Sequence, residues 1–259
     1  MNSTKPIGFF DSGLGGISVL KHTRKLLPGE DYLYYGDSAH APYGVRPAGE
    51  VEELCVRGVE RLLEQGVKAV VLACNTATSV AVTYLREQYP QIPFIGTEPA
   101  LKPAVEQFPQ GRILVMATAT TLQENKFQEL WAQYREDADI VPVPCSGLME
   151  FVERGELDGR EVETFLREKL TPFMDRPIDA VVLGCTHYPF LRPVIRQVVG
   201  ERTAIFDSAD GVARQLRHQL ESRDLLSPSV TGGQVIFQNS LDDPEILRRS
   251  RALLEYAQG

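Results

Sequence analysis

Cysteine is scarce in this sequence, and the spacing of the cysteines argues against both a disulfide-stabilised domain and a structural zinc site. Four cysteines occur among 259 residues, at positions 55, 74, 145 and 185. They are too few and too far apart for the disulfide framework of a small secreted domain. No C-x-x-C pair occurs, so the usual ligand spacing of a structural zinc site is missing as well. We therefore expect a reduced, metal-free protein whose thiols are either core residues or reagents.

Long apolar runs, a positive net charge and Lys/Arg-rich runs are missing too. Lys plus Arg number 27 against 35 for Asp plus Glu, which gives a net charge of −8. Such a chain repels polyanions, so neither nucleic acid nor an anionic membrane is an expected partner. No stretch approaches the ~18 consecutive apolar residues of a membrane span, and Met1–Gly8 lacks the apolar core of a signal peptide. We expect a cytoplasmic protein that is neither exported nor membrane-spanning.

What the sequence does contain is a regular alternation of short apolar runs with longer periodic segments. This alternation is typical of β-α-β units built around parallel strands, and it predicts an α/β fold. The predicted strands are Ile7–Asp11, Asp31–Tyr35, Ala69–Ala73, Pro93–Gly96, Arg112–Met116, Ile140–Val143, Ala180–Gly184, Thr203–Phe206 and Gln234–Gln238. The predicted helices are Ile17–Leu27, Glu50–Gln65, Ala77–Tyr89, Leu122–Tyr134, Leu148–Arg154, Arg160–Phe173, Leu191–Val199, Gly211–Glu221 and Asp243–Tyr256.

The predicted strand plan repeats once along the chain. Residues 69–74 read AVVLAC and residues 180–185 read AVVLGC, an offset of 185 − 74 = 111. The fourth strands end with the same offset, 207 − 96 = 111, and the second strands with 145 − 37 = 108. One shared string would carry little weight, because all buried parallel strands are rich in Val, Ile and Leu. Several matched ends in order predict two related α/β domains that face each other across a cleft.

The carboxyl ends of the predicted strands carry many polar residues, and ligands of open α/β sheets bind beyond these ends. C-N-T follows one strand from position 74, and C-T-H-Y follows its repeat from position 185. Each cysteine enters a polar turn that opens a helix, where free N–H groups and the helix dipole lower the pKa of a thiol from about 8.5. Facing domains would bring Cys74 and Cys185 to one ligand from opposite sides.

The remaining cysteines and the histidines divide between packing and function. We predict that Cys55 and Cys145 are packing residues. Cys55 lies on a helical face, and Cys145 lies at a strand end that lacks a cluster of polar neighbours. His187 lies two residues after Cys185, so a role in proton transfer is favoured over packing. The histidines at 22, 40 and 218 lack such a context and are assigned surface or loop roles.

The glycine-rich run after the first strand favours a small-molecule site over a nucleotide cofactor. D-S-G-L-G-G at 11–16 begins like a dinucleotide fingerprint, but Ser18 occupies the third glycine position. No G-x-x-x-x-G-K-[ST] phosphate loop occurs, and Asp11 would repel a phosphate. We expect these glycines to let backbone approach a small ligand at a helix N-terminus, and we expect no cofactor.

Four strings of the sequence are specific enough to indicate a family. They read FFDSGLGGISVL at 9–20, GDSAHAPYG at 36–44, ACNTAT at 73–78 and LGCTHYPFLRPVI at 183–195. With them the chain resembles the cofactor-independent glutamate racemases of the aspartate/glutamate racemase superfamily. The resemblance implies interconversion of L- and D-glutamate, which supplies D-glutamate for peptidoglycan. It also implies a discontinuous first domain of residues 1–97 plus 208–259, with residues 98–207 forming the second.

The resemblance further implies roles for particular side chains. Cys74 would deprotonate D-glutamate with Asp11 beside it, and Cys185 would deprotonate L-glutamate with His187 beside it. A glutamate assists His187, and both Glu153 and Glu150, which lies one helical turn earlier, are candidates. The implied substrate contacts are Asp11, Ser12, Tyr43, Gly44, Asn75, Thr76, Thr118, Thr121, Thr186 and His187.

Three other interpretations of the same residues stay open. A racemase of aspartate or of a hydantoin would differ in pocket walls that sequence does not measure. A non-catalytic amino-acid-binding protein would need neither thiol, and a thiol hydrolase would leave the second cysteine unexplained. We expect a homodimer, as is common in the family. Only Met1–Pro6 precede the first strand, so we also expect no activation by the cell-wall precursor that some relatives bind through a long N-terminal extension.

Overall fold

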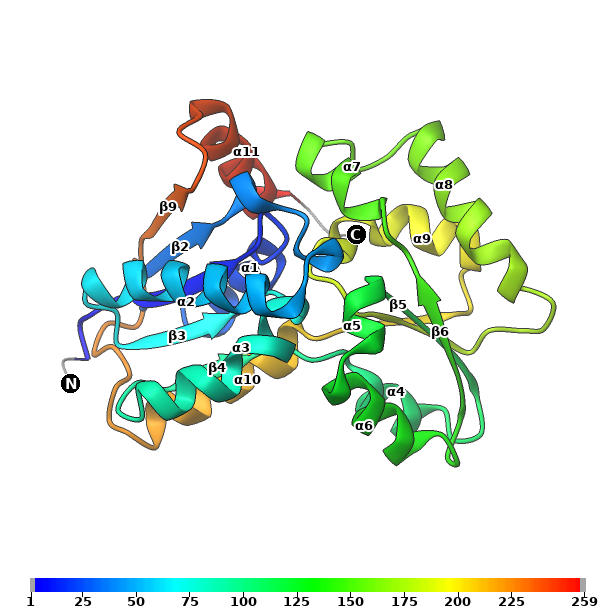
Figure 1. The fold of residues 1–259 in the computed structure, drawn as a ribbon, viewed down its shortest axis with the longest axis horizontal. Helices are drawn as coiled ribbons and strands as arrows, with labels where there is room; N and C mark the ends of the chain where they lie inside the picture. Colours follow the sequence, from blue (N-terminus) through cyan, green and yellow to red (C-terminus); the bar gives the residue numbers. More distant parts are fainter. Residues whose placement is uncertain (1–2, 257–259) are drawn as a thin grey trace.

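The computed structural model describes residues 3–256, and its first sheet is built from both ends of the chain. This sheet contains β1 (Ile7–Asp11), β2 (Tyr32–Gly36), β3 (Ala69–Leu72), β4 (Phe94–Gly96) and β9 (Val235–Asn239). The strand order is β4-β3-β1-β2-β9, and every pairing is parallel. The C-terminal stretch therefore returns to extend the sheet with which the chain begins (Figure 1).

A second, smaller sheet is built from the middle of the chain. It contains β5 (Arg112–Ala117), β6 (Asp139–Pro144), β7 (Ala180–Leu183) and β8 (Ala204–Asp207), again all parallel, in the order β6-β5-β7-β8. Numbered within its own half, each sheet has the order four-three-one-two, so the repeat read from the sequence is a repeat of topology. The predicted α/β class with two pseudo-symmetric parallel sheets is confirmed. We call the two halves the first and second lobes, after the sheet each contains.

Helices flank both sheets. Around the first lie α1 (Ile17–Leu26), α2 (Ala48–Glu64), α3 (Asn75–Gln88), α10 (Ala209–Glu221) and α11 (Pro244–Glu255) (Figure 1). Around the second lie α4 (Leu101–Gln107), α5 (Ala119–Gln123), α6 (Asn125–Tyr134), α7 (Leu148–Arg154), α8 (Arg160–Leu170) and α9 (Arg192–Val199). Short 3₁₀ turns cover Ser38–His40, Tyr43–Val45, Thr171–Phe173 and Tyr188–Leu191. Within residues 3–256 we find no helix with the length and apolar character needed to cross a membrane.

Two helical segments differ from the sequence-based prediction. The single helix predicted over Leu122–Tyr134 is two helices, because Glu124 is extended (φ −67°, ψ 145°) and separates α5 from α6. The helix α4 was not predicted; Leu101, Ala104 and Val105 bury one face of it, but its seven residues give too short a pattern to recognise. The prolines in β6 are tolerated because this strand lies at the edge of its sheet.

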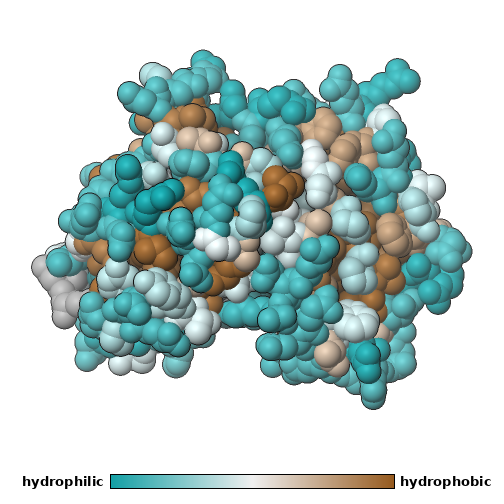
Figure 2. Space-filling model, in the orientation of Figure 1, coloured by the Kyte–Doolittle hydropathy of each residue, from teal (hydrophilic) through white to brown (hydrophobic). Residues whose placement is uncertain are grey.

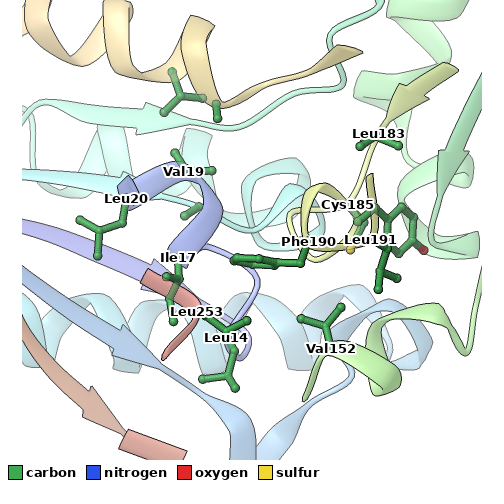
Figure 3. Close-up of a cluster of buried hydrophobic side chains, with 14 of the residues drawn as sticks. Leu14, Ile17, Val19, Leu20, Val152, Leu183, Cys185, Phe190, Leu191 and Leu253 are labelled. Atoms are coloured by element: carbon green, nitrogen blue, oxygen red, sulfur yellow. The ribbon is translucent and has the colours of Figure 1, made fainter. Parts of the chain in front are cut away.

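One hydrophobic cluster joins the two lobes. It contains Leu14 and Ile17, which follow β1, together with Val152 of α7, Phe190 after β7 and Leu253 of α11 (Figure 3). The outer surface in the view of Figure 2 is largely hydrophilic, with hydrophobic residues in scattered patches. Because close-packed cores deform little, this shared cluster fixes the strand ends of one lobe relative to those of the other.

Candidate active site

The carboxyl ends of strands from both lobes meet around a small cavity. Its lining contains both predicted reactive thiols and most of the predicted substrate contacts: Ser12, Tyr43, Gly44, Cys74, Asn75, Thr76, Thr118, Thr121, Met149, Gly184, Cys185, Thr186 and His187. Asp11 and Glu153, also predicted, lie outside this lining. A larger, more open hollow lies along the two connections between the lobes and contains neither thiol.

Cys74 lies where β3 ends and α3 begins. Its Sγ accepts a hydrogen bond from the Ala77 N–H at 3.5 Å and lies 3.4 Å from the Ser12 hydroxyl, to which it donates. Burial raises the pKa of the Cys74 thiol to about 12, and the charge of Asp11 acts in the same direction, against the contacts with Ser12 and Ala77. The expectation that the helix start lowers this pKa is wrong for Cys74, because the loss of water outweighs the two local contacts.

Cys185 occupies the equivalent place after β7, but it has a different environment. A turn and the 3₁₀ segment Tyr188–Leu191 separate it from α9, so it is not at the start of an α-helix as predicted. Its Sγ lies 3.6 Å from His187 Nδ1. The thiol is thus paired with an ionisable side chain, whereas Cys74 is paired with a hydroxyl and a backbone N–H.

His187 connects Cys185 to a carboxylate. Its Nε2 lies 2.7 Å from Glu153 Oε1, while its Nδ1 faces the thiol. Burial acts to lower the pKa of His187, but the hydrogen bonds and charges of Cys185 and Glu153 raise it well above its ordinary value. Of the two glutamates that the sequence left open, Glu153 is the one that reaches His187; one carboxylate oxygen of Glu150 is buried without a hydrogen-bond partner.

Asp11 lies behind the cavity, fully buried at the end of β1. Its carboxylate accepts the Gly13 N–H at 2.9 Å and the Thr186 hydroxyl at 3.3 Å, so it joins the two lobes. Burial raises the pKa of Asp11, although the charge of His187 and backbone N–H groups act against this. Its influence on Cys74 is through charge rather than through a hydrogen bond.

The rest of the cavity wall is made of neutral polar groups. The hydroxyls of Thr76 in the first lobe and of Thr118 and Thr121 in the second form a cluster, with oxygen separations of 3.4, 3.2 and 2.9 Å. The Asn75 amide oxygen is buried and has no hydrogen-bond partner. A buried acceptor without a donor is costly, so this atom is ready to receive an N–H group of a ligand.

Several residues that support the site were not predicted. Asp37 accepts the Tyr43 hydroxyl at 2.6 Å, and the Thr120 hydroxyl donates to the Gly44 carbonyl at 2.6 Å, which connects the loop after β2 to α5. Asp37 ends a strand, which is a usable signal, and Thr120 lies between two predicted contacts. Met149 has no signal at all in the sequence, because its side chain reaches the cavity only through the placement of α7.

In this arrangement, two thiols from facing lobes line one small cavity. Cys74 comes from β3 and Cys185 from β7, the third strand of each half, and hydroxyl, amide and N–H groups surround them. No cluster of three or more His, Cys, Asp or Glu side chains within residues 3–256 is arranged to hold a metal ion. The geometry suits proton transfer to and from opposite faces of a small ligand.

Comparison with known proteins agrees with this chemistry. A family model described as Asp/Glu/Hydantoin racemase matches residues 17–216. The chain belongs to this family of racemases, which are isomerases.

Within that family the similarity is to glutamate racemases. The chain is 50% identical over 250 residues to a glutamate racemase of Clostridium perfringens, covering 96% of each chain. It superposes with a TM-score of 0.84 and 27% identity on the glutamate racemase of Francisella tularensis in complex with D-glutamate, covering 98% of this chain and 95% of that one. The Escherichia coli glutamate racemase, in complex with L-glutamate and the activator UDP-MurNAc-Ala, gives 0.84 and 30% identity over 95% of each chain. The resemblance predicted from the sequence motifs is confirmed.

Proposed function

We propose that this protein interconverts L- and D-glutamate by a two-thiol proton exchange at Cα. The observation that carries the proposal is the pair of buried cysteines, Cys74 and Cys185, on equivalent strand ends of facing lobes around one cavity. A racemase must remove a proton from one face of a carbon centre and return one to the other face. Two acid–base groups on opposite walls meet that requirement, and a site with one nucleophilic cysteine and its base would not need the second.

The reaction has two balanced proton transfers. A thiolate on one side takes the Cα proton, so that an S–H bond forms while the C–H electron pair remains on Cα and is delocalised into the adjacent carboxylate. The thiol on the other side then gives up its proton, and a C–H bond of opposite configuration forms as that sulfur becomes a thiolate. We assign removal of the proton of D-glutamate to Cys74 and of L-glutamate to Cys185, as the family resemblance implies.

The pKa values suit a difficult deprotonation. A Cys74 thiol with a pKa near 12 is hard to ionise but is a strong base once ionised. A desolvated base of this strength narrows the gap to the very weakly acidic Cα proton. On the other side, His187 lies close enough to the Cys185 sulfur to exchange a proton with it, and Glu153 holds the imidazole in place.

The charged groups of the substrate would form hydrogen bonds with the neutral polar side chains that line the cavity. We propose that the Thr76, Thr118 and Thr121 hydroxyls and the Ser12 hydroxyl donate to carboxylate oxygens, and that the free Asn75 oxygen accepts from the ammonium group. Neutral donors stabilise the developing negative charge without fixing the charge of either thiol. The relatives crystallised with D- and with L-glutamate support glutamate as the substrate.

The cellular setting follows from this activity. We propose that the protein acts in the cytoplasm, where it supplies D-glutamate for peptidoglycan, and that it forms a homodimer. The supply of D-glutamate is supported by the glutamate racemases that the chain matches over 96% of its length. The domain division at residues 1–97 plus 208–259 and 98–207 is supported by the return of β9 to the first sheet.

A single incubation tests the activity. L-Glutamate is incubated with the protein in D₂O without any added cofactor, and circular dichroism is followed together with deuterium at Cα. We expect the optical signal to decay to zero and deuterium to enter Cα. Aspartate and a hydantoin are the matched controls for the alternative substrates. The absence of both optical change and exchange with L-glutamate would refute the glutamate racemase function.

Removal of either thiol tests the mechanism. Cys74→Ala and Cys185→Ala are each expected to lower racemisation by a factor of at least about 10³, since a proton-transferring group is lost completely. Cys55→Ala is the matched control, because that thiol is buried in α2 and is not among the residues that line the cavity, and activity should remain. Normal turnover in both directions by either active-site variant would refute the two-thiol mechanism.

A further inference from the structure

Glu153 is held by the first lobe at both its side chain and its main chain, although it belongs to the second. Its Oε1 accepts the Leu14 N–H at 2.7 Å in addition to its contact with His187. Its main-chain carbonyl accepts a hydrogen bond from Arg249 Nη1 of α11. The group that orients His187 is therefore placed by contacts across the boundary between the lobes.

Arg249 is built into this boundary. Its side chain is 28% exposed, and its Nη2 lies 3.5 Å from Glu245 Oε1, one turn earlier on α11. It passes close to Gly155, the residue that ends α7 with φ +80°, since a Cβ there would lie 3.7 Å from Arg249 Cδ. α11 itself is anchored by Ile246 and Leu253 in the shared hydrophobic cluster, and Figure 1 shows it beside α7.

The contact acts on the end of a short helix. The last carbonyls of an α-helix lack intrahelical partners, and a cation there also interacts favourably with the helix dipole. α7 has only seven residues, and Glu153 lies in its last turn. A donor on the Glu153 carbonyl consequently restrains the backbone from which the Glu153 carboxylate extends.

The two thiols differ in what supports them. Cys74 is contacted by Ser12 and Ala77, both in the first lobe. Cys185 depends on His187 and, through it, on Glu153, whose position is set from the first lobe by Leu14 and Arg249. A disturbance at the α11–α7 contact would reach the support of one thiol and not of the other.

We propose that Arg249 is a positioning residue for the Cys185 half of the reaction: by holding the end of α7, it keeps Glu153 on His187 and His187 aimed at Cys185. The inference rests on the proposed glutamate racemase function. It assigns Arg249 no contact with substrate.

The ratio of kcat/KM in the two directions cannot reveal this role, because the equilibrium constant fixes it. L- and D-glutamate are mirror images, so their equilibrium constant is one and any variant must change kcat/KM equally in the two directions. A slower Cys185 step shows itself instead in the isotope effects of the two substrates. It raises the deuterium isotope effect on kcat/KM for α-deuterated L-glutamate and lowers it for α-deuterated D-glutamate.

The variant to test is Arg249→Ala. We expect kcat/KM to fall on the order of 10- to 100-fold in both directions, the size expected when a reacting group is misplaced from a distance. We also expect the two isotope effects to move apart in the sense just given. Arg249→Lys, which keeps one charged donor, should show a smaller loss of kcat/KM and a smaller separation of the two isotope effects.

Arg248→Ala is the matched control. Arg248 is the neighbouring residue on α11 and pairs with the same Glu245, but it is 77% exposed and does not contact Glu153. Exposed ion pairs contribute little, so its kinetics should stay within about twofold of the native protein. If Arg249→Ala lost activity with unchanged isotope effects, or if Arg248→Ala behaved in the same way, the positioning role would be overturned.

A titration that does not depend on turnover separates this inference from the proposed function. The His187 ring is followed by NMR against pH in the native protein and in Arg249→Ala. Glu153, Cys185 and Asp11 are the ionisable groups whose charges act on His187. We expect a lower pKa of His187 in the variant, because the hydrogen bond that the His187 ring donates to the Glu153 carboxylate weakens. An unchanged pKa overturns the positioning role even if the native protein racemises glutamate, whereas a native protein that fails to racemise glutamate overturns only the proposed function.

Discussion

The four cysteines are all buried, so burial alone does not distinguish a reagent from a core residue. Burial raises the pKa of Cys145 to about 12, much as it does for Cys74. The difference lies in the neighbours: Cys145 Sγ donates only to the Val143 carbonyl, whereas Cys74 and Cys185 face hydroxyl, N–H or imidazole groups around a cavity. A thiol that must change its charge needs partners that tolerate both states.

Asp11 is the residue at which we expect the proposed function to lower the stability of the fold. Burial raises its pKa, which means that the charged carboxylate is less stable in the folded protein than in the unfolded chain, where water would hydrate it. Asp11→Asn removes the charge, and it also replaces one of the two acceptor oxygens by an NH₂ group. We expect the free energy of unfolding of the variant, relative to that of the native protein, to increase as pH rises to 7, while racemase activity falls.

The pH dependence gives this prediction its sign. A carboxyl whose folded pKa is raised above the unfolded value contributes stability only while it is protonated, and that contribution is lost as pH rises. The stability of Asp11→Asn relative to the native protein should therefore be greatest at pH 7 and should decrease as pH falls toward the raised pKa. Urea unfolding at several pH values measures this difference, and a difference that does not change with pH would contradict the argument.

At the scale of elements, the loop between β1 and α1 shows why glycine is needed near the site. A Cβ on Gly13 would lie 2.1 Å from Glu153 Oε1, much closer than atoms approach without bonding. The absence of a side chain is what allows the Leu14 N–H to reach the Glu153 carboxylate from the other lobe. The glycine run thus serves contact between lobes as well as an approach to ligand.

Gly13→Ala is expected to displace Glu153 and to lower kcat/KM by about 10²-fold or more through His187. Gly211→Ala is the control, because a Cβ there meets nothing within 4 Å and lies inside α10. That change should leave activity intact and raise stability by up to about 1 kcal/mol, the usual gain of Ala over Gly in a helix. Steady-state kinetics and urea unfolding of both variants measure these effects. Full activity of Gly13→Ala would show that racemisation does not depend on the position of Glu153.

At the scale of the whole molecule, the proposed catalysis depends on two lobes that meet at a small cavity. The boundary is fastened by polar contacts as well as by the shared core: Thr186 to Asp11, Glu153 to Leu14, and Thr120 to the Gly44 carbonyl. Substrate must enter this small cavity, which these contacts help to enclose. We therefore expect opening and closing of the lobes to affect substrate binding.

The Thr120 contact provides a test that leaves the reacting groups untouched. Thr120→Val removes the hydroxyl and leaves the Gly44 carbonyl without its donor. A lost neutral hydrogen bond of about 1 kcal/mol corresponds to a roughly fivefold change, which we expect as a lower kcat/KM in both directions, mainly through a higher KM. Thr120→Ser keeps the hydroxyl and should behave like the native protein. An unchanged KM in Thr120→Val would remove this contact from substrate binding.

The sequence by itself determined the α/β class, the repeated strand plan and the positions of the two thiols, because each depends on local periodicity or on a short string at a strand end. It did not separate Glu153 from Glu150, since both lie on one face of the same short helix. Packing of α7 against the loop after β1 decided that Glu153 meets His187.

Tertiary structure also decided the electrostatics. The start of α3 alone predicts a lowered pKa for Cys74, yet complete burial between two lobes raises it. The contact of Arg249 with Glu153 joins residues 96 positions apart and leaves no trace in either segment. Local patterns record what each strand end offers, whereas desolvation and contacts between the lobes exist only once the two halves of the chain have packed together.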